Sequence, residues 1–335
     1  MRRRSLFICS VGALGLLLAL SAVVGPAAAQ VVKVRMGSSL SPPSLDTFTP
    51  YVALELGLFR KYGLDVEILE FRGGTTHMKA LLSGEVDVAG ELGATDTILA
   101  ASKGAKARFW LVPQPVTPYH FVARREAATT LQGLAGRTVA VSGIGAISYH
   151  IPRIVLDRSG VNPDAPKYIA VGSPSDRFKA LLAGKVDATV VTNTEAAKLG
   201  NYPEIVSLVQ VPKVLPEVPY NFCVARTEYI EKNPETMAKL TRAMIEASRW
   251  MAANKAGTVE LAAKVLKGET AETLGRAYDL ADPRIWGVNG DLTEAAYKYT
   301  VALLLRVGYL KEPVLFETLF DRRFLDQVLR ELGRI

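Results

Sequence analysis

Small hydroxyl-bearing residues and glycines gather where predicted strands give way to predicted helices. Ser39 follows the first predicted strand, Gly74 opens the next predicted helix, and Gly93 precedes another. The free N–H groups of a helix N-terminus, together with hydroxyl groups, suit a carboxylate, sulfonate or carbonyl group of a ligand. Each hydroxyl could instead cap only its own helix. The ligand-binding candidates of this kind are Ser39, Thr75, Thr76, Thr95, Ser142, Gly145 and Ser148.

Two carboxylates stand at comparable positions and could accept hydrogen bonds from an amine or an aminopyrimidine. Asp96 lies at the start of a predicted helix, and Glu195 follows a predicted strand end at residues 190–191. Both could equally be solvated residues of a first helical turn. Polar neighbours and residues of two Pro-Tyr segments complete the set of candidates: Asp96, Tyr119, Thr192, Thr194, Glu195 and Asn221.

The sequence holds none of the common catalytic motifs. It has no G-x-S-x-G, H-E-x-x-H, Walker A or C-x-x-C pattern. His77, His120 and His150 are far apart and none has a metal-ligand partner four residues on, so we expect no metal site. Residues 143–148 nearly match the dinucleotide fingerprint, but Ser148 replaces the third glycine and the following strand ends without an acidic residue. We therefore expect a binding protein that is not an enzyme and needs no cofactor.

Charge and hydropathy at the start of the chain indicate secretion. Of 335 residues, 40 are Lys or Arg and 33 are Asp or Glu, a net charge of +7. Three arginines open the chain, an almost purely apolar run spans residues 6–24, and Ala27-Ala28-Ala29 follows. This order is typical of a cleaved secretory signal over residues 1–29, although an uncleaved membrane anchor is the alternative. Cleavage removes the three arginines, which lowers the net charge from +7 to +4.

The remaining basic residues do not indicate nucleic-acid binding. The longest basic runs beyond residue 29 are pairs such as Arg124-Arg125, which has Glu126 beside it. The sequence near these pairs shows no residue spacing typical of an RNP-type RNA-binding motif or of a zinc finger. We expect a periplasmic, monomeric protein that binds a small molecule and no nucleic acid.

A repeat about one hundred residues long predicts the domain organisation. Residues 79–89 recur as residues 179–189, both with the pattern Ala-Leu-Leu-x-Gly-x-Val-Asp, and residues 118–124 recur as residues 219–226. Each copy of the first segment reads as a helix that ends at glycine, a turn and a buried strand. The period is domain-sized, so it indicates two similar α/β lobes rather than a solenoid. Asp87 and Asp187 are expected to be structural residues of the strand entries.

Strands and helices alternate along both predicted lobes. The predicted strands span residues 31–38, 65–71, 86–90, 108–112, 137–142 and 167–171, and the predicted helices 51–62, 73–82, 146–159 and 175–182. Helices at 233–254, 257–267, 270–280, 293–307 and 322–332 are expected to pack on the first lobe. Thr95 or Asp96 is expected to cap the helix after the third strand, and Tyr220 and Phe121 to lie in the core. This alternation is typical of α/β lobes with mainly parallel sheets.

Residues 53–67, the two Ala-Leu-Leu-x-Gly-x-Val-Asp segments and residues 134–142 resemble the periplasmic solute-binding proteins of ABC importers. The most similar branch includes binders of sulfonates, taurine, nitrate and thiamine-precursor pyrimidines. The resemblance implies an α/β two-lobe, type II periplasmic binding fold with a ligand cleft between the lobes, and delivery to a membrane permease. It implies a first lobe over residues 30–120, a second lobe over 121–220, and a return to the first lobe over 221–335.

The sequence departs from that branch at one site. Many members carry Gly-Ser-x-Ser-His at the start of a helix in the second lobe, where this chain has Gly145-Ala146-Ile147-Ser148-Tyr149. The change disfavours simple sulfonate or nitrate as the ligand. We expect capture of a small sulfonate, carboxylate or pyrimidine-like compound by cleft closure. The alternatives are an enzyme of the same fold acting on a pyrimidine or menaquinone-type precursor, and a sensory receptor domain.

Overall fold

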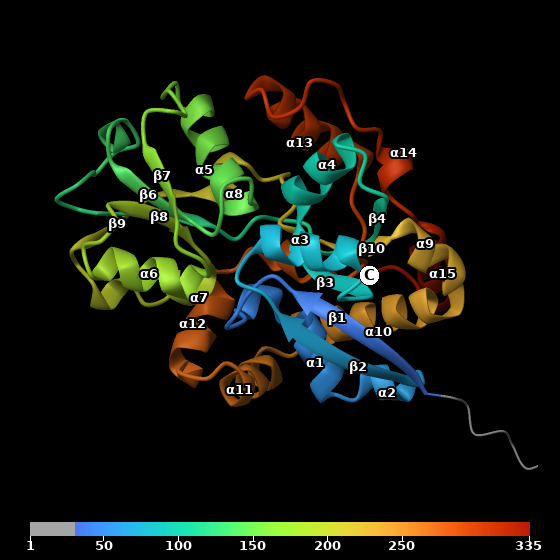
Figure 1. Ribbon diagram of the computed structural model, residues 1–335. Coiled ribbons are helices and arrows are strands. Elements are labelled where there is room, and N and C mark those ends of the chain that lie inside the picture. Colours follow the sequence, from blue (N-terminus) through green and yellow to red (C-terminus); the bar gives the residue numbers. More distant parts are fainter. Residues whose placement is uncertain (1–30) are drawn as a thin grey trace, which may run out of the picture. The chain divides into compact units, whose positions relative to one another are not determined.

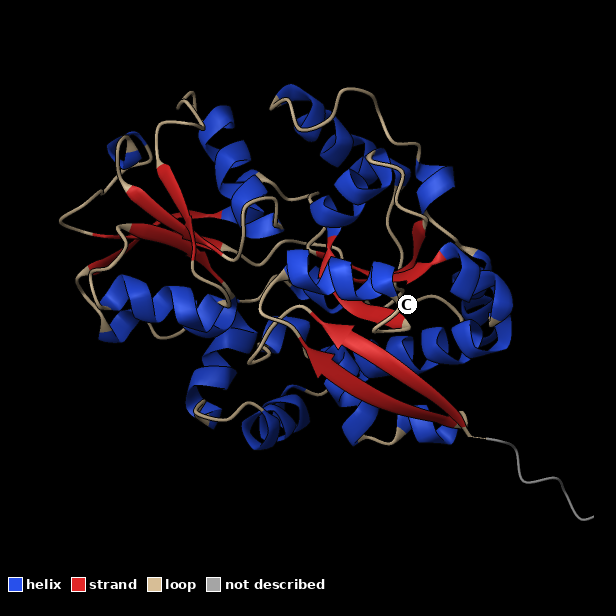
Figure 2. Cartoon of the chain, viewed as in Figure 1, coloured by secondary structure: helices blue, strands red, loops and turns tan. Residues whose placement is uncertain are grey.

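The computed structural model describes residues 31–335, which form two α/β lobes, each built on a five-stranded sheet (Figures 1 and 2). The predicted signal peptide lies outside the described residues. Within residues 31–335, no helix is both long enough and apolar enough to cross a lipid bilayer.

The sheet of the first lobe has the strand order β2-β1-β3-β10-β4. Its strands are β1 (Val32–Ser38), β2 (Leu64–Glu70), β3 (Val88–Gly93), β4 (Ala107–Gln114) and β10 (Asn221–Arg226). β1 runs parallel to β2 and β3, whereas β10 runs antiparallel to β3 and β4. The strand that completes this sheet therefore arrives from a distant part of the sequence.

The sheet of the second lobe repeats this design with the order β7-β6-β8-β5-β9. Its strands are β5 (His120–Arg124), β6 (Thr138–Val141), β7 (Lys167–Ala170), β8 (Ala188–Val191) and β9 (Ile205–Gln210). β5 is antiparallel to β8 and β9, as β10 is to β3 and β4. The two Pro-Tyr segments thus lead into the equivalent crossover strands of the two lobes.

The repeated aspartates have the same structural role in both lobes. A carboxylate oxygen of Asp87 accepts a hydrogen bond from the backbone N–H of Arg35 at 2.9 Å, and Asp187 accepts one from Thr138 N–H at 2.8 Å. Each aspartate therefore ties the entry of one parallel strand to its neighbour. The repeat in the sequence corresponds to a repeated unit of structure.

Helices cover both sheets, and α5 and α6 lie on opposite faces of the second one (Figure 1). The first lobe contributes α1 (Thr49–Glu55), α2 (Leu58–Lys61), α3 (Gly74–Ser83) and α4 (Ala94–Ser102). The second contributes α5 (Ile147–Arg158), α6 (Pro174–Leu182), α7 (Asn193–Ala196) and α8 (Val211–Val214). Short 3-10 turns lie at η1 (Leu45–Thr47), η2 (Gln132–Leu134), η3 (Leu199–Asn201) and η4 (Pro283–Trp286).

The C-terminal part is helical, as predicted, but it contacts both lobes. Its helices are α9 (Thr227–Lys232), α10 (Pro234–Ala253), α11 (Lys255–Val265), α12 (Ala271–Leu280), α13 (Glu294–Arg306), α14 (Phe316–Leu319) and α15 (Arg323–Leu332). α10 packs on α1, α2 and β4 of the first lobe. α12 contacts η1 of the first lobe and also α7 of the second lobe, where Arg276 Nε donates to the carbonyl oxygen of Ala197 at 3.2 Å. The expectation that these helices pack on the first lobe therefore leaves out the contact of α12 with the second lobe.

Two predicted element boundaries near the ligand candidates also differ from the structure. The helix predicted over residues 51–62 is broken at Gly57, whose φ of 68° is left-handed and ends the regular helix. β3 runs on to Gly93, beyond the predicted end at residue 90, because Leu92 and Gly93 pair with β10. Gly93 then occupies the N-cap position of α4, so Thr95 and Asp96 lie inside the first turn and neither caps the helix.

Candidate functional site

The two lobes meet through buried polar contacts near the ends of their parallel strands. Asp46 of the first lobe accepts hydrogen bonds from Asn193 of the second, from its backbone N–H at 3.0 Å and from Nδ2 at 2.7 Å. Thr95 Oγ1 lies 2.9 Å from Nδ1 of His150, and Thr194 Oγ1 accepts from Leu45 N–H at 3.2 Å. Strand ends and helix starts of both lobes are therefore held against one another.

A small enclosed cavity, which we call the inner chamber, lies at this junction and has a volume of about 20 Å³. Such a space accommodates one group of about the size of a water molecule. Its walls come from both lobes, and eight of the thirteen residues that line it carry a polar side chain: Ser39, Leu40, Gly73, Gly74, Glu91, Gly93, Asp96, Tyr119, Ser142, Ile147, Arg177, Tyr220 and Asn221.

Glu91 of β3 supplies a fully buried carboxyl group to the inner chamber. Its Oε1 accepts hydrogen bonds from Ser38 Oγ at 2.5 Å and from Ser39 N–H at 2.8 Å. Its Oε2 is buried without a hydrogen-bond partner among the described residues. Burial raises the pKa of this carboxyl group to about 8, so near neutral pH it can either donate or accept a hydrogen bond.

Asp96 of α4 supplies the second carboxyl group, and only 7% of its surface is exposed. Oδ1 lies 3.8 Å from Nδ1 of His150 and accepts from Thr95 Oγ1 at 3.3 Å, while Oδ2 is buried and has no partner in residues 31–335. Burial raises the pKa of Asp96 to about 7 and lowers that of His150 to about 3. The histidine is therefore neutral beside this carboxyl group.

Arg177 of α6 brings a guanidinium group to the chamber from the second lobe. The side chain is buried, and its N–H groups donate to Thr189 Oγ1 at 3.2 Å, to the Gly172 carbonyl at 2.7 Å and to the Val190 carbonyl at 2.9 Å. These are all neutral oxygens of its own lobe. Within residues 31–335 it makes no ion pair, so this buried cation lacks the charged partner that such groups usually have.

Aromatic and amide groups from the two crossover segments complete the chamber. Tyr119 and Tyr220 meet edge to face with ring centroids 5.1 Å apart. Asn221 Nδ2 donates to Gln114 Oε1 at 3.3 Å. Each Pro-Tyr segment connects the two lobes, so Tyr119, Tyr220 and Asn221 line the inner chamber where the chain crosses from one lobe to the other.

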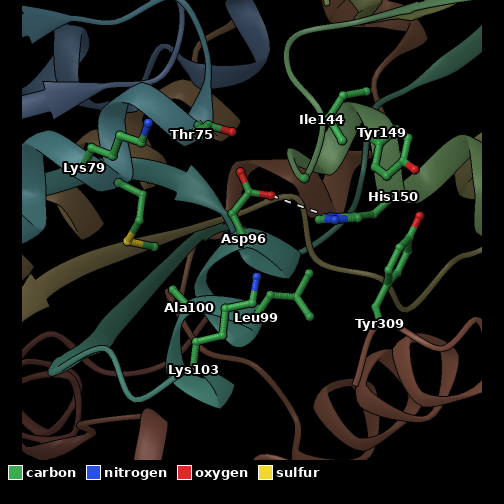
Figure 3. Close-up of a pocket in the computed structure, with 13 residues that line it drawn as sticks. Thr75, Lys79, Asp96, Leu99, Ala100, Lys103, Ile144, Tyr149, His150 and Tyr309 are labelled. Atoms are coloured by element: carbon green, nitrogen blue, oxygen red, sulfur yellow. Dashed lines mark ion pairs between the residues drawn. The ribbon is translucent and has the colours of Figure 1, made fainter. Parts of the chain in front are cut away.

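A larger and more open cavity of about 490 Å³ adjoins the inner chamber, and we call it the outer cavity. Gly74 and Asp96 line both spaces. Figure 3 shows Asp96 between Lys79 and Thr75 on one side and Tyr149, His150 and Tyr309 on the other. The volume of the outer cavity lies in the range of small-molecule binding pockets.

Residues 46–257 match the family model described as NMT1/THI5 like. This chain belongs to the NMT1/THI5-like family. Its relatives include YtlA of Bacillus subtilis (strain 168), named as a binding protein, which is 25% identical over 291 residues, or 81% of this chain and 78% of the relative. The formylaminopyrimidine-binding protein of Halalkalibacterium halodurans is 27% identical over 218 residues, 64% of each chain.

Solved structures show that this NMT1/THI5-like protein has the two-lobe periplasmic binding fold, as predicted. The nitrate-binding protein NrtA from Synechocystis PCC 6803 superposes with a TM-score of 0.75 at 16% identity, over 91% of this chain and 90% of that one. The alkanesulfonate-binding protein SsuA from Xanthomonas axonopodis pv. citri gives 0.73 at 18%, over 88% and 100%. The desulfurization enzyme DSZB gives 0.63 at 15%, over 90% and 99%, so one neighbour of the fold is catalytic.

The structure brings part of the predicted candidate set of this family member together. Ser39, Asp96, Tyr119, Ser142 and Asn221 line the inner chamber, and Asp96, Thr75 and Gly145 line the outer cavity. Whether these residues bind a ligand remains a prediction.

The other hydroxyl candidates hold local structure. Thr76 Oγ1 donates to the Gly73 carbonyl at 2.9 Å within its own helix turn. Ser148 Oγ accepts from Ser142 N–H at 2.8 Å, which fixes the turn before α5. Thr95 is fully buried, and its hydroxyl bonds to His150. These residues support the cavity walls and do not themselves line the cavities.

The segment that begins at Thr192 lies apart from the inner chamber. Glu195 accepts from Thr192 Oγ1 at 2.7 Å and from Thr192 N–H at 3.2 Å, a reciprocal cap on α7. Thr194 and Glu195 border a separate hollow of about 20 Å³ beside Pro42 and Glu269. Glu195 thus lies in the first turn of α7, but at 4% exposure it is buried and not solvated, as the alternative to a ligand role had it.

Several cavity residues were not predicted from the sequence. Glu91 lies beyond the end predicted for its strand, and Arg177 lies within a predicted helix without any motif around it. Tyr220 was expected in the core and is buried, but it also lines the chamber. The outer cavity adds Lys79, Lys103, Tyr149, His150 and Tyr309. Among residues 31–335, no group of three or more His, Cys, Asp or Glu side chains is placed to hold a metal ion.

Proposed function

We propose that this protein is the extracytoplasmic solute-binding component of an ABC-type importer. It captures a small organic solute, a sulfonate, carboxylate or pyrimidine-like compound, at the junction of its lobes and presents it to a membrane permease. The predicted signal peptide and the periplasmic proteins that share the fold support this location.

One observation carries the proposal. Glu91 and Asp96 of the first lobe each present an unpartnered, buried carboxyl oxygen, and Arg177 of the second lobe presents a buried guanidinium group to the same chamber. Buried polar groups usually have partners, because an unsatisfied one costs about 1–3 kcal/mol. A solute with hydrogen-bond donors toward the first lobe and acceptors toward the second would satisfy both lobes at once.

The names of relatives support a binding role and the range of solutes. One relative is named for binding formylaminopyrimidine, and structures of the same fold are named for binding alkanesulfonate and nitrate. Aminopyrimidines carry N–H donors that suit the two carboxyl groups, and sulfonates or carboxylates carry acceptors that suit the guanidinium group.

Ligand-induced thermal stabilisation tests the proposal. The purified protein is heated with taurine, short alkanesulfonates, dicarboxylates and 4-aminopyrimidines, and a compound present at one hundred times its Kd should add about 2.7 kcal/mol to the free energy of unfolding. The variants Glu91→Gln and Arg177→Met should lose this stabilisation, whereas the exposed-site control Glu85→Gln should keep it.

Mass spectrometry of the same samples separates binding from catalysis. A solute-binding protein returns the compound unchanged after incubation. If the compound were converted, or if none of these classes raised the melting temperature, the proposed function would be wrong.

A further inference from the structure

One face of α4 forms a continuous wall of the outer cavity. Asp96, Leu99, Ala100 and Lys103 all line it, and their spacing of three, four and seven residues places them in a row along the helix. At a rise of 1.5 Å per residue, positions 96 and 103 are about 10 Å apart along the axis. The wall therefore begins at a carboxyl group and ends at an ammonium group.

α3 forms a second wall with a similar order. Thr75, Met78 and Lys79 lie three and four residues apart on one face and line the same cavity. The opposite side is closed by Ile144 and by the ring of Tyr149, which approaches Tyr309 with centroids 6.2 Å apart. The outer cavity is thus a groove with an apolar middle section.

The inner end of this groove admits only a small group. The adjoining chamber has a volume of about 20 Å³, enough for a single amine- or water-sized group. Asp96 is 7% exposed and aims an unpartnered Oδ2 at this point, and Glu91 contributes an unpartnered Oε2. Two such oxygens suit an amine or another N–H donor.

Two cations line the outer cavity. Lys79 and Lys103 are both exposed, and neither forms an ion pair with any residue of the part of the chain that the structure describes. Between the two ends, Ile144 leaves 57% of its surface exposed beside Met78 and Leu99. Ile144, Met78 and Leu99 thus supply apolar side chains to the lining of a cavity whose size suits a small molecule.

From this order of groups we infer that the solute is an elongated compound with two unlike ends. It has an N–H donor in the inner chamber, an apolar or aromatic body on α3 and α4, and an anionic group, carboxylate or sulfonate, that Lys79 or Lys103 binds. This inference rests on the proposed function and narrows its ligand class.

Three compounds with one skeleton test the inference by calorimetry. 4-(4-aminophenyl)butanoate carries an amine and a carboxylate at its two ends, 4-phenylbutanoate lacks the amine, and 4-butylaniline lacks the carboxylate. The complete compound should bind at least ten-fold more tightly than either truncated one.

Substitutions of the two lysines test whether they bind the anionic group of the ligand. Lys79→Gln and Lys103→Gln should each weaken binding of 4-(4-aminophenyl)butanoate about five-fold, as expected for one partly exposed ion pair, and leave binding of 4-butylaniline unchanged. The control Lys185→Gln replaces an exposed lysine in the turn between α6 and β8, away from the groove, and should change neither Kd.

The outcomes distinguish this inference from the proposed function. If a compact sulfonate, carboxylate or aminopyrimidine binds while 4-(4-aminophenyl)butanoate does not, the elongated ligand is wrong and the binding role stands. Equal affinity for the complete compound and 4-butylaniline, or no effect of either lysine variant, would also overturn it. If no compound of either panel binds, the proposed function itself fails.

Discussion

Raising the pH from 6.5 to 8 should destabilise this protein because three buried carboxyl groups must then ionise. Burial raises the pKa of Asp46 and Asp96 to about 7 and that of Glu91 to about 8. In the unfolded chain such groups titrate near pH 4. Between these values the folded protein keeps three protons that the unfolded chain has released, and its stability falls as the pH rises.

Three buried histidines oppose this trend at lower pH. Burial lowers the pKa of His77 and His150 to about 3, and it also lowers that of His120, which lies 3.0 Å from Asn193 Oδ1. Below the ordinary histidine pKa near 6.5, the unfolded chain takes up three protons that the folded protein does not. From pH 5 to pH 6 the two sets of groups therefore offset each other.

Once the histidines of the unfolded chain have lost their protons, they no longer offset the protons that the buried carboxyl groups hold in the folded state. Each proton held only by the folded state changes the free energy of unfolding by about 1.4 kcal/mol per pH unit. With the carboxyl pKa values above and unfolded histidines at 6.5, the folded state holds on average about one extra proton between pH 6.5 and 8. The expected loss of stability over this interval is about 2 kcal/mol, against less than 1 kcal/mol between pH 5 and 6.

Urea unfolding at constant ionic strength, followed by circular dichroism at pH 5, 6, 6.5, 7 and 8, measures this profile. Asp46→Asn or Glu91→Gln should reduce the loss above pH 6.5, because an amide does not ionise. The control Glu85→Gln changes an exposed carboxylate and should leave the profile as it is. A stability that rises from pH 6.5 to 8, or an equal decline in all three variants, would refute the reasoning.

Two further substitutions and one labelling experiment test the packing, the junction between the lobes and the burial of a thiol group. Gly37→Ala would place a Cβ atom 2.0 Å from Nε2 of His77, so urea unfolding should show a loss of at least about 2 kcal/mol. Asn193→Ala removes the Nδ2 donor to the buried Asp46 carboxyl group and keeps only the backbone N–H donor, so small-angle scattering should show a larger radius of gyration as the lobes separate. The Cys223 thiol is fully buried and its pKa is raised, so it should react with a thiol reagent only after unfolding in urea.

The fold was predictable to the extent that it depends on local sequence. Gly84 and Gly184 both have left-handed φ angles, at 84° and 68°, and each ends a helix before a buried strand. Only glycine adopts this conformation at little cost, so the signal survives in both copies of the repeat. The two similar lobes were predictable because each copy of the repeat shows the helix, glycine and buried-strand pattern by itself.

Elements that depend on distant partners were harder to predict. β9 (Ile205–Gln210) is half-exposed, and among the strands of residues 31–335 it pairs with β5 alone, more than eighty residues earlier in the chain. Edge strands of this kind lack the continuous apolar run of a central strand. α12 likewise contacts the second lobe through Arg276 and the Ala197 carbonyl, a contact that no local pattern indicates.

The residues that line the inner chamber also fall into two groups, those that the sequence indicated and those that it did not. Ser39, Asp96 and Ser142 stand where a strand gives way to a helix, and the general geometry of α/β sheets points to such positions. Glu91 instead lies within β3, and Arg177 lies in the middle of α6. In a strand or a helix, a charged residue normally indicates the solvent face. A charged residue at either position is therefore expected to face solvent and gives no sign of a cavity.

What places Arg177 in the chamber is the tertiary fold. Its guanidinium group reaches from α6 to the carbonyl oxygen of Gly172, in the loop after β7, and to that of Val190, within β8. Those oxygens converge only after β7, β6 and β8 have assembled into one sheet. Glu91 is held in a similar manner by the hydroxyl group of Ser38, 53 residues earlier, and by the N–H that follows it at the end of β1. Both side chains are thus positioned by groups that the sheets bring together, so the positions of strand ends were predictable and the acidic and basic residues that reach them were not.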